Sequence, residues 1–526
     1  MNWIATDNVN IPPDASNDYK YAAGIDYLEG NDCAVRHKKA IALLQEAANA
    51  GHEEAMRTLA ELHHREIGLG LTPDGEIYWL NKLVDLAEER YYAEYHREFG
   101  DTCCRYMEQL FTALFSHDKL ADAQELGERW HRLATDMEER YLSLVPLATA
   151  ELRLSDLFYY MGQSEMALMY CRNVYDRLLP HCDEYAASLA VLVCGAAERL
   201  FNLMFILSIP GDSDPHKQNA ERLEAELVKN TDAGREYYPF QLKKMRITFP
   251  MRSDAEDRKG IWLEQKHFYS NAIQAQEKYM LEADTPSAKD AFAEKCMEYA
   301  NVCKHTSDPQ EAYDYYKKAY DLWKELFDRR PRAQYQVLMA QCLQLQIPIL
   351  LRQFNYTQAK RNAYLACSMV TQLRDPELTQ HAKEMLAENY RQIYEALMQS
   401  LLLEAAQEIV CKLALLEKEA KDGDAAGMVY LRHLSNLTKK GDGYAEGRQY
   451  SYAISCYGAG ILFAEYFRNQ APLLSLKHAN SLQVILSGSV IGLYKRLGGV
   501  EAKLGNKNAA RECHRMARYI RDHSLK

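Results

Sequence analysis

The stretch YMGQSEMALMYCRNVY, residues 160–175, decides the fold. Gly162 stands five residues before Ala167, so a turn leads directly into a new segment. Ala167, Cys171 and Val174 then follow at steps of four and three residues, which places them on one face of a helix. A small residue at such a position lets two helices pack closely, and the stretch therefore predicts the turn and second helix of a helix hairpin.

This pattern returns along the chain at a nearly constant spacing. LGNKNAARECHRMARY, residues 504–519, again places a glycine five residues before its alanine. The triples of positions 0, +4 and +7 begin at Ala40, Ala123, Ala167, Ala312, Ala359, Ala405, Ala453 and Ala510. Steps of 44, 47, 46 and 48 residues separate 123 from 167, 312 from 359, 359 from 405 and 405 from 453. A fixed period indicates stacked repeats, because one hairpin alone cannot bury its apolar face.

Length and composition agree with an all-α fold. The chain has 526 residues, which is more than one compact core usually accommodates, and only 25 Gly and 15 Pro interrupt it. From about residue 18 to the end, apolar positions recur at steps of three and four residues, and period-two alternation is nowhere sustained. Helices joined by short breaks are expected throughout.

Charge and cysteine usage predict a soluble intracellular chain. The 63 basic and 74 acidic residues leave a net charge of −11, which disfavours bulk binding to nucleic acid. The 13 cysteines show no pairing rhythm, which suits thiols that a cytosol keeps reduced. The N-terminus has neither the basic start nor the apolar core of a secretory signal, and polar residues interrupt the most apolar stretches. We therefore expect a cytoplasmic protein with no membrane partner.

The quoted runs resemble tetratricopeptide repeats. The N-terminal part is similar instead to a Sel1-like repeat, through Tyr27, Gly30, Lys39, Ala40, Ala47, Ala48, Gly51 and Ala55. The resemblance implies an alpha-alpha superhelix of tetratricopeptide-like helical hairpins. The units are longer than the usual period of about 34 residues. They are also divergent, since Phe354, Ser400 and Arg448 stand where the turn glycine is expected.

A stretch rich in Pro, Gly and Asp interrupts the repeats and divides the chain. It is either the joint between two arrays or a long insertion within one repeat. The predicted organisation is an extended segment at 1–17, Sel1-like and tetratricopeptide-like repeats at 18–209, the joint or insertion at 210–260, and further repeats with a capping helix at 261–526.

Motifs for catalysis, cofactor binding or metal binding are missing. His52 and Glu53 resemble the start of a zinc-protease helix, but Met56 occupies the position of the second histidine. Cys103 and Cys104 lack the two-residue spacer of a redox site and are expected to be core thiols. The sequence therefore predicts no catalytic residue, cofactor or metal ligand.

In tetratricopeptide-like folds the first helix of each hairpin lines a concave groove, so polar and aromatic residues there are candidate contacts. Counting back from the contact alanines gives Asn301, Lys304, His305, Arg352, Tyr390, Arg391, Tyr394 and Lys495. The lysine and asparagine pair with which some family members hold a peptide carboxylate is not reproduced, since Met297 precedes Asn301. A solvated helix face is the alternative for each residue.

These observations favour a non-enzymatic scaffold for protein–protein interaction. It is expected to hold a protein segment on the concave face, with no nucleic acid as partner. The alternative is a regulatory sensor that binds a short peptide or small ligand and signals to a separate protein.

Overall fold

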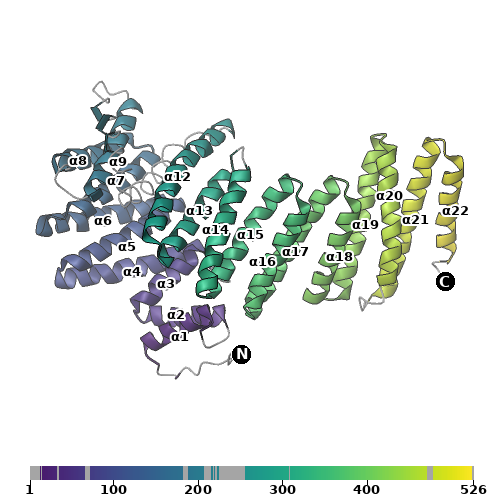
Figure 1. Ribbon diagram of the computed structural model, residues 1–526, viewed down its shortest axis with the longest axis horizontal. Helices are drawn as coiled ribbons and strands as arrows, with labels where there is room; N and C mark the ends of the chain where they lie inside the picture. Colours follow the sequence, from purple (N-terminus) through teal and green to yellow (C-terminus); the bar gives the residue numbers. More distant parts are fainter. Residues whose placement is uncertain are drawn as a thin grey trace. The chain divides into compact units, whose positions relative to one another are not determined.

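The computed structural model is built from helices alone in the part of the chain that it describes. These residues are 12, 15–31, 35–65, 71–181, 187–206, 215–216, 218–219, 222–223, 255–306, 309–470 and 478–523. They form consecutive antiparallel hairpins (Figure 1). The prediction of an all-α fold of tetratricopeptide-like hairpins is confirmed.

The helices follow one another with short breaks. Those before residue 210 are α1 (Asn17–Glu29), α2 (His37–Asn49), α3 (Glu53–His64), α4 (Pro73–Glu94), α5 (Arg97–Ser116), α6 (Leu120–Tyr141), α7 (Leu144–Tyr160), α8 (Ser164–Leu178), the 3-10 helix η1 (Leu179–His181) and α9 (Ala187–Ile206). Those after residue 250 are α12 (Ala255–Ala283), α13 (Pro286–Cys303), α14 (Pro309–Arg329), α15 (Ala333–Arg352), α16 (Tyr356–Gln372), α17 (Pro376–Gln399), α18 (Leu403–Ala420), α19 (Gly423–Glu446), α20 (Tyr450–Gln470), α21 (Ala479–Lys503) and α22 (Lys507–His523).

The chain forms two compact units. The first unit comprises residues 1–345 and 369–379, and the second comprises residues 346–368 and 380–526. The joint or insertion predicted at 210–260 lies largely outside the described residues, and α12 begins at Ala255 within it. The extended segment predicted at 1–17 also lies largely outside them; α1 begins at Asn17, where the Ser16 side chain accepts a hydrogen bond from the Tyr19 N–H.

The contact alanines are buried, as the repeat pattern predicts. Ala123, Ala167, Ala312, Ala359 and Ala453 each have an exposed fraction of 0%. Each lies near the start of the second helix of a hairpin, where a larger side chain would push the two helices apart. The small residues therefore set the close packing that defines each repeat.

The predicted triple that begins at Ala405 is wrong by one residue. Ala405 is half-buried and Lys412 is exposed, whereas Ala406 and Leu413 are buried at 0% and 7% exposure. With Ala406 as the contact residue, the alanines at 312, 359, 406 and 453 are 47 residues apart each time (359 − 312, 406 − 359 and 453 − 406). Two adjacent alanines concealed the register, because either one satisfies a requirement for a small residue.

The turns inside the hairpins need a left-handed residue whether or not it is glycine. Gly162 has a φ of 79°, and Phe354, Leu401 and Arg448 have φ of 59°, 58° and 58°. A left-handed conformation costs an L-residue about 1–2 kcal/mol. The sequence predicted Ser400 for one of these turns, and the same one-residue shift assigns the position to Leu401 instead.

In the first unit, one carboxylate caps two helices from distant parts of the chain. Asp375 Oδ1 accepts hydrogen bonds from the Glu377 and Leu378 N–H groups at the start of α17, both at 3.0 Å. Its Oδ2 accepts the His37 N–H at the start of α2, at 2.7 Å. Burial by itself raises the pKa of Asp375, but these hydrogen bonds outweigh it and hold the pKa at about 2. The N-terminal hairpin is thereby tied to residues 369–379.

Candidate functional site

The first helices of neighbouring hairpins contact one another within each unit. In the first unit these are α5, α7 and α9, and in the second they are α17, α19 and α21. We call the side of these helices that points away from the second helices the first-helix face. It is the side on which the sequence places candidate partner contacts.

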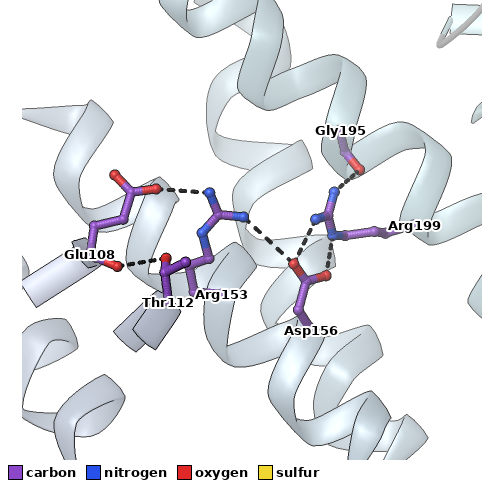
Figure 2. Close-up of polar contacts among 6 residues, drawn as sticks. All are labelled: Glu108, Thr112, Arg153, Asp156, Gly195 and Arg199. Atoms are coloured by element: carbon purple, nitrogen blue, oxygen red, sulfur yellow. Dashed lines mark hydrogen bonds and ion pairs between the residues drawn. The ribbon is translucent and has the colours of Figure 1, made fainter. Parts of the chain in front are cut away.

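In the first unit, buried charged side chains on the first helices pair with one another (Figure 2). Arg153 of α7 donates to Glu108 of α5 at 2.8 Å, and its Nη1 lies 3.8 Å from Asp156 Oδ2. Arg199 of α9 donates to both oxygens of Asp156, at 2.6 and 2.7 Å, and to the Gly195 carbonyl at 2.9 Å. The result is a continuous network from α5 through α7 to α9.

Three of the four side chains in this network are removed from solvent, and the Glu108 side chain is 35% exposed. The side chains of Arg153, Asp156 and Arg199 are 4%, 6% and 4% exposed. Burial by itself lowers the pKa of Arg199, but the bidentate Asp156 carboxylate outweighs it and the pKa is raised. The Arg199 guanidinium therefore stays charged, and its ion pair with Asp156 joins neighbouring repeats.

The sequence contains a signal for this network that the prediction did not use. Glu108, Arg153 and Arg199 are separated by 45 and 46 residues (153 − 108 and 199 − 153), which are repeat-length steps. Arg199 also interrupts one of the most apolar stretches of the chain. A charge inside an apolar helix, recurring at the repeat period, indicates a ladder of paired side chains.

A cavity of about 440 Å³ adjoins the same network. Its charged wall comes from α5 and includes Arg97, Asp101, Arg105 and Glu108. Its apolar wall comes from the start of α7 and the turn before it, and includes Leu142, Val145 and Pro146. Glu108 belongs to both the cavity wall and the network. The cavity is large enough to hold a small ligand.

Three of the predicted contact residues lie at the end of α13 in the first unit. Asn301 Oδ1 accepts a hydrogen bond from the Tyr316 hydroxyl at 2.7 Å and is 3.4 Å from Lys304 Nζ. Asn301 and Lys304 are half-buried, and His305 is exposed in the turn that follows. The structure brings Asn301 and Lys304 together through an internal hydrogen bond.

Three others share α17 in the second unit. Tyr390 is buried at 4% exposure and points into the core. Arg391 forms ion pairs with Glu388 at 2.9 Å and with Glu417 at 2.8 Å. The Tyr394 hydroxyl is 3.0 Å from His433 Nδ1 and accepts a hydrogen bond from Asn436 at 3.1 Å.

His433 lies beneath the first-helix face of α19. Burial lowers its pKa to about 4, and it is 3% exposed. Its ring also packs edge-on against Phe463 at 4.5 Å between centroids. Since Tyr394, His433 and Asn436 join α17 to α19, the predicted contact Tyr394 acts in this structure as part of the seam between repeats.

The remaining predicted residues, Arg352 and Lys495, are exposed. Lys495 lies on the first-helix face of α21. The prediction did not group it with the other exposed side chains that lie near it on α19 and α21. Together they form what we call the basic–apolar face, which consists of Met428, Arg432 and Lys439 on α19 with Ile485 and Lys495 on α21.

The register between α19 and α21 follows from two polar contacts. His478 Nδ1 is 2.6 Å from Asp424 Oδ2, and Arg496 Nε is 2.8 Å from Asp442 Oδ1; both pairs are 54 residues apart. The two helices are therefore parallel, with each residue of α19 beside the residue 54 positions later. Ile485 is level with residue 431 and Lys495 with residue 441, so Ile485 lies near the end of the face that carries Met428 and Arg432, and Lys495 lies near Lys439.

The cations of the basic–apolar face have no carboxylate partner. Arg432, Lys439 and Lys495 are exposed and form no ion pair with any described residue. Met428 and Ile485 are 53% and 51% exposed. Positions 428, 432 and 439 share one side of α19 because residues three, four and seven apart on a helix point the same way.

Nine of the eleven cysteines that the structure describes are buried, as expected for Cys103 and Cys104, and Cys411 and Cys513 are half-buried. Burial raises the pKa of Cys104 to about 12 and that of Cys296 to about 12, so both stay protonated. Within the described ranges, no group of three or more His, Cys, Asp or Glu side chains is placed to hold a metal ion. Among these residues every helix is too short or too polar to cross a membrane.

No family model matches the sequence, and no curated protein matches it. Solved structures with a similar succession of helices include RapI in its apo form, at 9% identity and a TM-score of 0.30, over 60% of this chain and 99% of that chain. Aspartyl phosphate phosphatase F from Bacillus subtilis is similar at 13% identity and a TM-score of 0.30, over 71% of this chain and 94% of that chain. The antigen c5321 of uropathogenic Escherichia coli, which displays an SLR fold, is 12% identical with a TM-score of 0.23, over 94% and 95% of the two chains.

Proposed function

We propose that this chain is a non-enzymatic scaffold that holds a protein segment on the first-helix face of α17, α19 and α21. The basic–apolar face is the observation that supports this proposal. Two large apolar side chains, each about half exposed, lie beside cations that form no ion pair with any carboxylate in the described part of the chain. Such side chains gain from a partner that covers the apolar surface and supplies negative charge.

The predicted contact residues fit this proposal to different degrees. Lys495 belongs to the basic–apolar face. Arg391 lies on α17, and its side chain is 40% exposed. Tyr390 and Tyr394 would act through packing and through the Tyr394–His433 contact. Asn301, Lys304, His305 and Arg352 stay predicted contacts on other parts of the chain.

The test blocks the first-helix face without changing its charge. Ser435 is exposed on α19, on the same side as Arg432 and Lys439, and Ser455 is exposed on the second helix α20. Tagged wild-type protein, Ser435→Trp and Ser455→Trp are used to capture partners from lysate of the source organism, followed by mass spectrometry. We expect a stoichiometric protein that Ser435→Trp loses and Ser455→Trp retains; equal capture by all three would contradict the proposal.

A sensor is the second candidate, and the cavity beside Glu108 favours it. A cavity of about 440 Å³ accommodates a small ligand or a peptide side chain. Thr149 lines this cavity, so Thr149→Trp would fill it. Native mass spectrometry of the purified protein should then show a bound low-mass species in the wild type and none in Thr149→Trp. An empty wild-type protein would count against a sensor that retains its ligand.

A further inference from the structure

The register of α19 and α21 places the two lysines of the basic–apolar face in neighbouring turns, and neither forms an ion pair with a residue that the structure describes. Lys495 is level with residue 441 of α19, so its ammonium group is close to the turn that carries Lys439. Asp442, one turn after Lys439, is engaged elsewhere, since it accepts hydrogen bonds from Arg496 and from the Tyr457 hydroxyl. Glu446 is exposed two turns beyond Lys439, at the end of α19. Like charges held together in this way are relieved when an anionic group binds.

Acidic side chains on α17 confine the position of such an anion. Glu384, Glu388 and Glu395 are exposed on the side of α17 that continues the first-helix face, and Arg391 on the same side pairs with Glu388 and leaves this row with a net negative charge. The Tyr394 contacts with His433 and Asn436 place this row beside α19. An acidic partner is repelled by the α17 row and attracted by α19 and α21, so it is directed to the strip between the last two first helices.

The spacing of the face determines the kind of segment that fits. Met428 and Lys439 are 11 residues apart on one helix, which corresponds to about 16 Å at 1.5 Å per residue. An extended chain covers that length with about five residues. A bound helix is about 10 Å wide and would extend over the acidic row of α17. The strip therefore suits an extended chain.

We infer that the basic–apolar face binds an extended acidic protein segment, in which carboxylates lie about five residues from a large apolar side chain. The carboxylates contact Lys439 and Lys495, and the apolar side chain covers Met428 and Ile485. This inference rests on the proposed scaffold function and adds the chemistry of the partner.

The probe is a fluorescein-labelled peptide with two leucines and two glutamates separated by about five glycine and serine residues. Fluorescence polarisation of the full-length protein is measured with this peptide and with versions that carry lysines for the glutamates or serines for the leucines. We expect binding of the first peptide only, weakening as salt concentration rises because the charges are exposed. Single-stranded oligouridine serves as a polyanion without apolar side chains.

The variants separate charge from apolar contact. Lys439→Glu combined with Lys495→Glu should weaken peptide binding at least about tenfold, and Met428→Ser with Ile485→Ser should weaken it to a similar degree. The matched control is Arg511→Glu with Arg518→Glu, which makes the same change of net charge on exposed positions of α22. This control should bind within about twofold of the wild type.

Three outcomes would overturn the inference: stronger binding of the lysine peptide, unchanged binding by the Lys439 and Lys495 variant, or binding of oligouridine in place of the peptide. The scaffold proposal has a separate test. If Ser435→Trp still abolishes capture of the natural partner, the scaffold stands and only the acidic chemistry is wrong. If neither the charge reversal nor Ser435→Trp changes any binding, both proposals fail.

Discussion

The first-helix faces of the two units use charge in opposite ways. In the first unit, Glu108, Arg153, Asp156 and Arg199 neutralise one another across α5, α7 and α9. In the second unit, Arg432, Lys439 and Lys495 on α19 and α21 form no ion pair among the described residues, whereas Arg391 and Arg496 on the same set of helices do. The same repeat geometry thus supports two arrangements: charges that join repeats to each other, and charges that are free to meet a partner.

The difference has a physical cause in desolvation. Burying an ion is costly unless a partner of opposite charge is buried with it, so the first unit pairs its charges. Exposed ions keep their hydration and need no internal partner, which leaves those of the second unit available at little cost in stability. Removing a charge should therefore affect folding in the first unit and binding in the second.

The largest effect is expected when the buried pair is broken. Asp156→Ala leaves the Arg199 guanidinium without its carboxylate at 4% exposure, which should lower the free energy of unfolding by about 3–5 kcal/mol. All five tryptophans lie in residues 1–345, so urea unfolding followed by tryptophan fluorescence reports on the first unit.

Arg432→Ala is the matched removal of an exposed charge in the second unit. Its effect on unfolding should stay within about 0.5 kcal/mol, as measured by hydrogen exchange of α19. Replacing both members of the buried pair, Asp156→Leu with Arg199→Met, should recover much of the stability that Asp156→Ala loses. An Asp156→Ala protein as stable as the wild type would show that the network does not join the repeats.

The second unit should weaken in mild acid because of His433. Its folded pKa of about 4 is below the ordinary 6.5, so the unfolded chain takes up a proton first as the pH falls. The stabilisation is complete above pH 6.5 and declines toward pH 4 by about 3 kcal/mol. Hydrogen exchange of α19 should become faster over this range in the wild type and change less in His433→Gln. Equal pH dependence in both proteins would mean that the ring is not held neutral.

The double cap at Asp375 offers a smaller test within the first unit. Asp375→Ala removes hydrogen bonds to the N-termini of both α2 and α17. This change should lower the free energy of unfolding of the first unit by about 2 kcal/mol. Its folded pKa of about 2 is below the ordinary 3.8, so this contribution is present above pH 4 and is lost as the pH falls through about 2. Hydrogen exchange should rise at both helix starts together.

Thr285→Ala is the control for that test, since Thr285 accepts a hydrogen bond from the Ala288 N–H and caps α13. Loss of this hydrogen bond should lower the free energy of unfolding by about 1 kcal/mol and make hydrogen exchange at the start of α13 faster. If Asp375→Ala increased exchange at α17 and left α2 unchanged, the tie between residues 37 and 375 would be absent in solution.

The smallest effect is expected at the hairpin turns. Arg448→Gly removes the cost of a left-handed L-residue and should stabilise the second unit by about 1 kcal/mol. Gly162→Ala places an L-residue at the equivalent turn of the first unit, where φ is 79°, and should destabilise it by a similar amount. Thermal unfolding of both variants gives the sign; a stabilised Gly162→Ala would show that the turn adopts another conformation.

The fold was predictable because its signal is local and repeated. Ala167 and Ala359 mark helix contacts at fixed distances from a turn, and each such residue describes one hairpin. The register at Ala405 was wrong because two adjacent alanines satisfy the same requirement and only burial distinguishes them. The left-handed turns at Phe354 and Arg448 could not be assigned from composition, since glycine is preferred there but is not required.

The candidate site was less predictable because its partners come from different repeats. Counting back from the alanines points to first helices, and the structure has Lys495 exposed on one of them, α21. The count could not separate Tyr390, which is buried, from Arg391, which is on the surface, because neighbours on a helix point about 100° apart. The sequence did not point to Arg432 and Lys439. Whether a cation has a carboxylate beside it depends on the side chains of the neighbouring helix, and a count along one helix does not show them.

The constant spacing of 47 residues between Ala312, Ala359, Ala406 and Ala453 also limits how a chain of this kind changes in length. Deleting one full period, residues 360–406, would join two equivalent positions and leave each remaining seam with a matching surface. A deletion of one or two residues inside a helix rotates every following side chain by about 100° per residue and mismatches the next seam. Gain and loss of whole repeats is therefore the easiest path by which relatives of this protein would lengthen or shorten, with smaller changes confined to the turns.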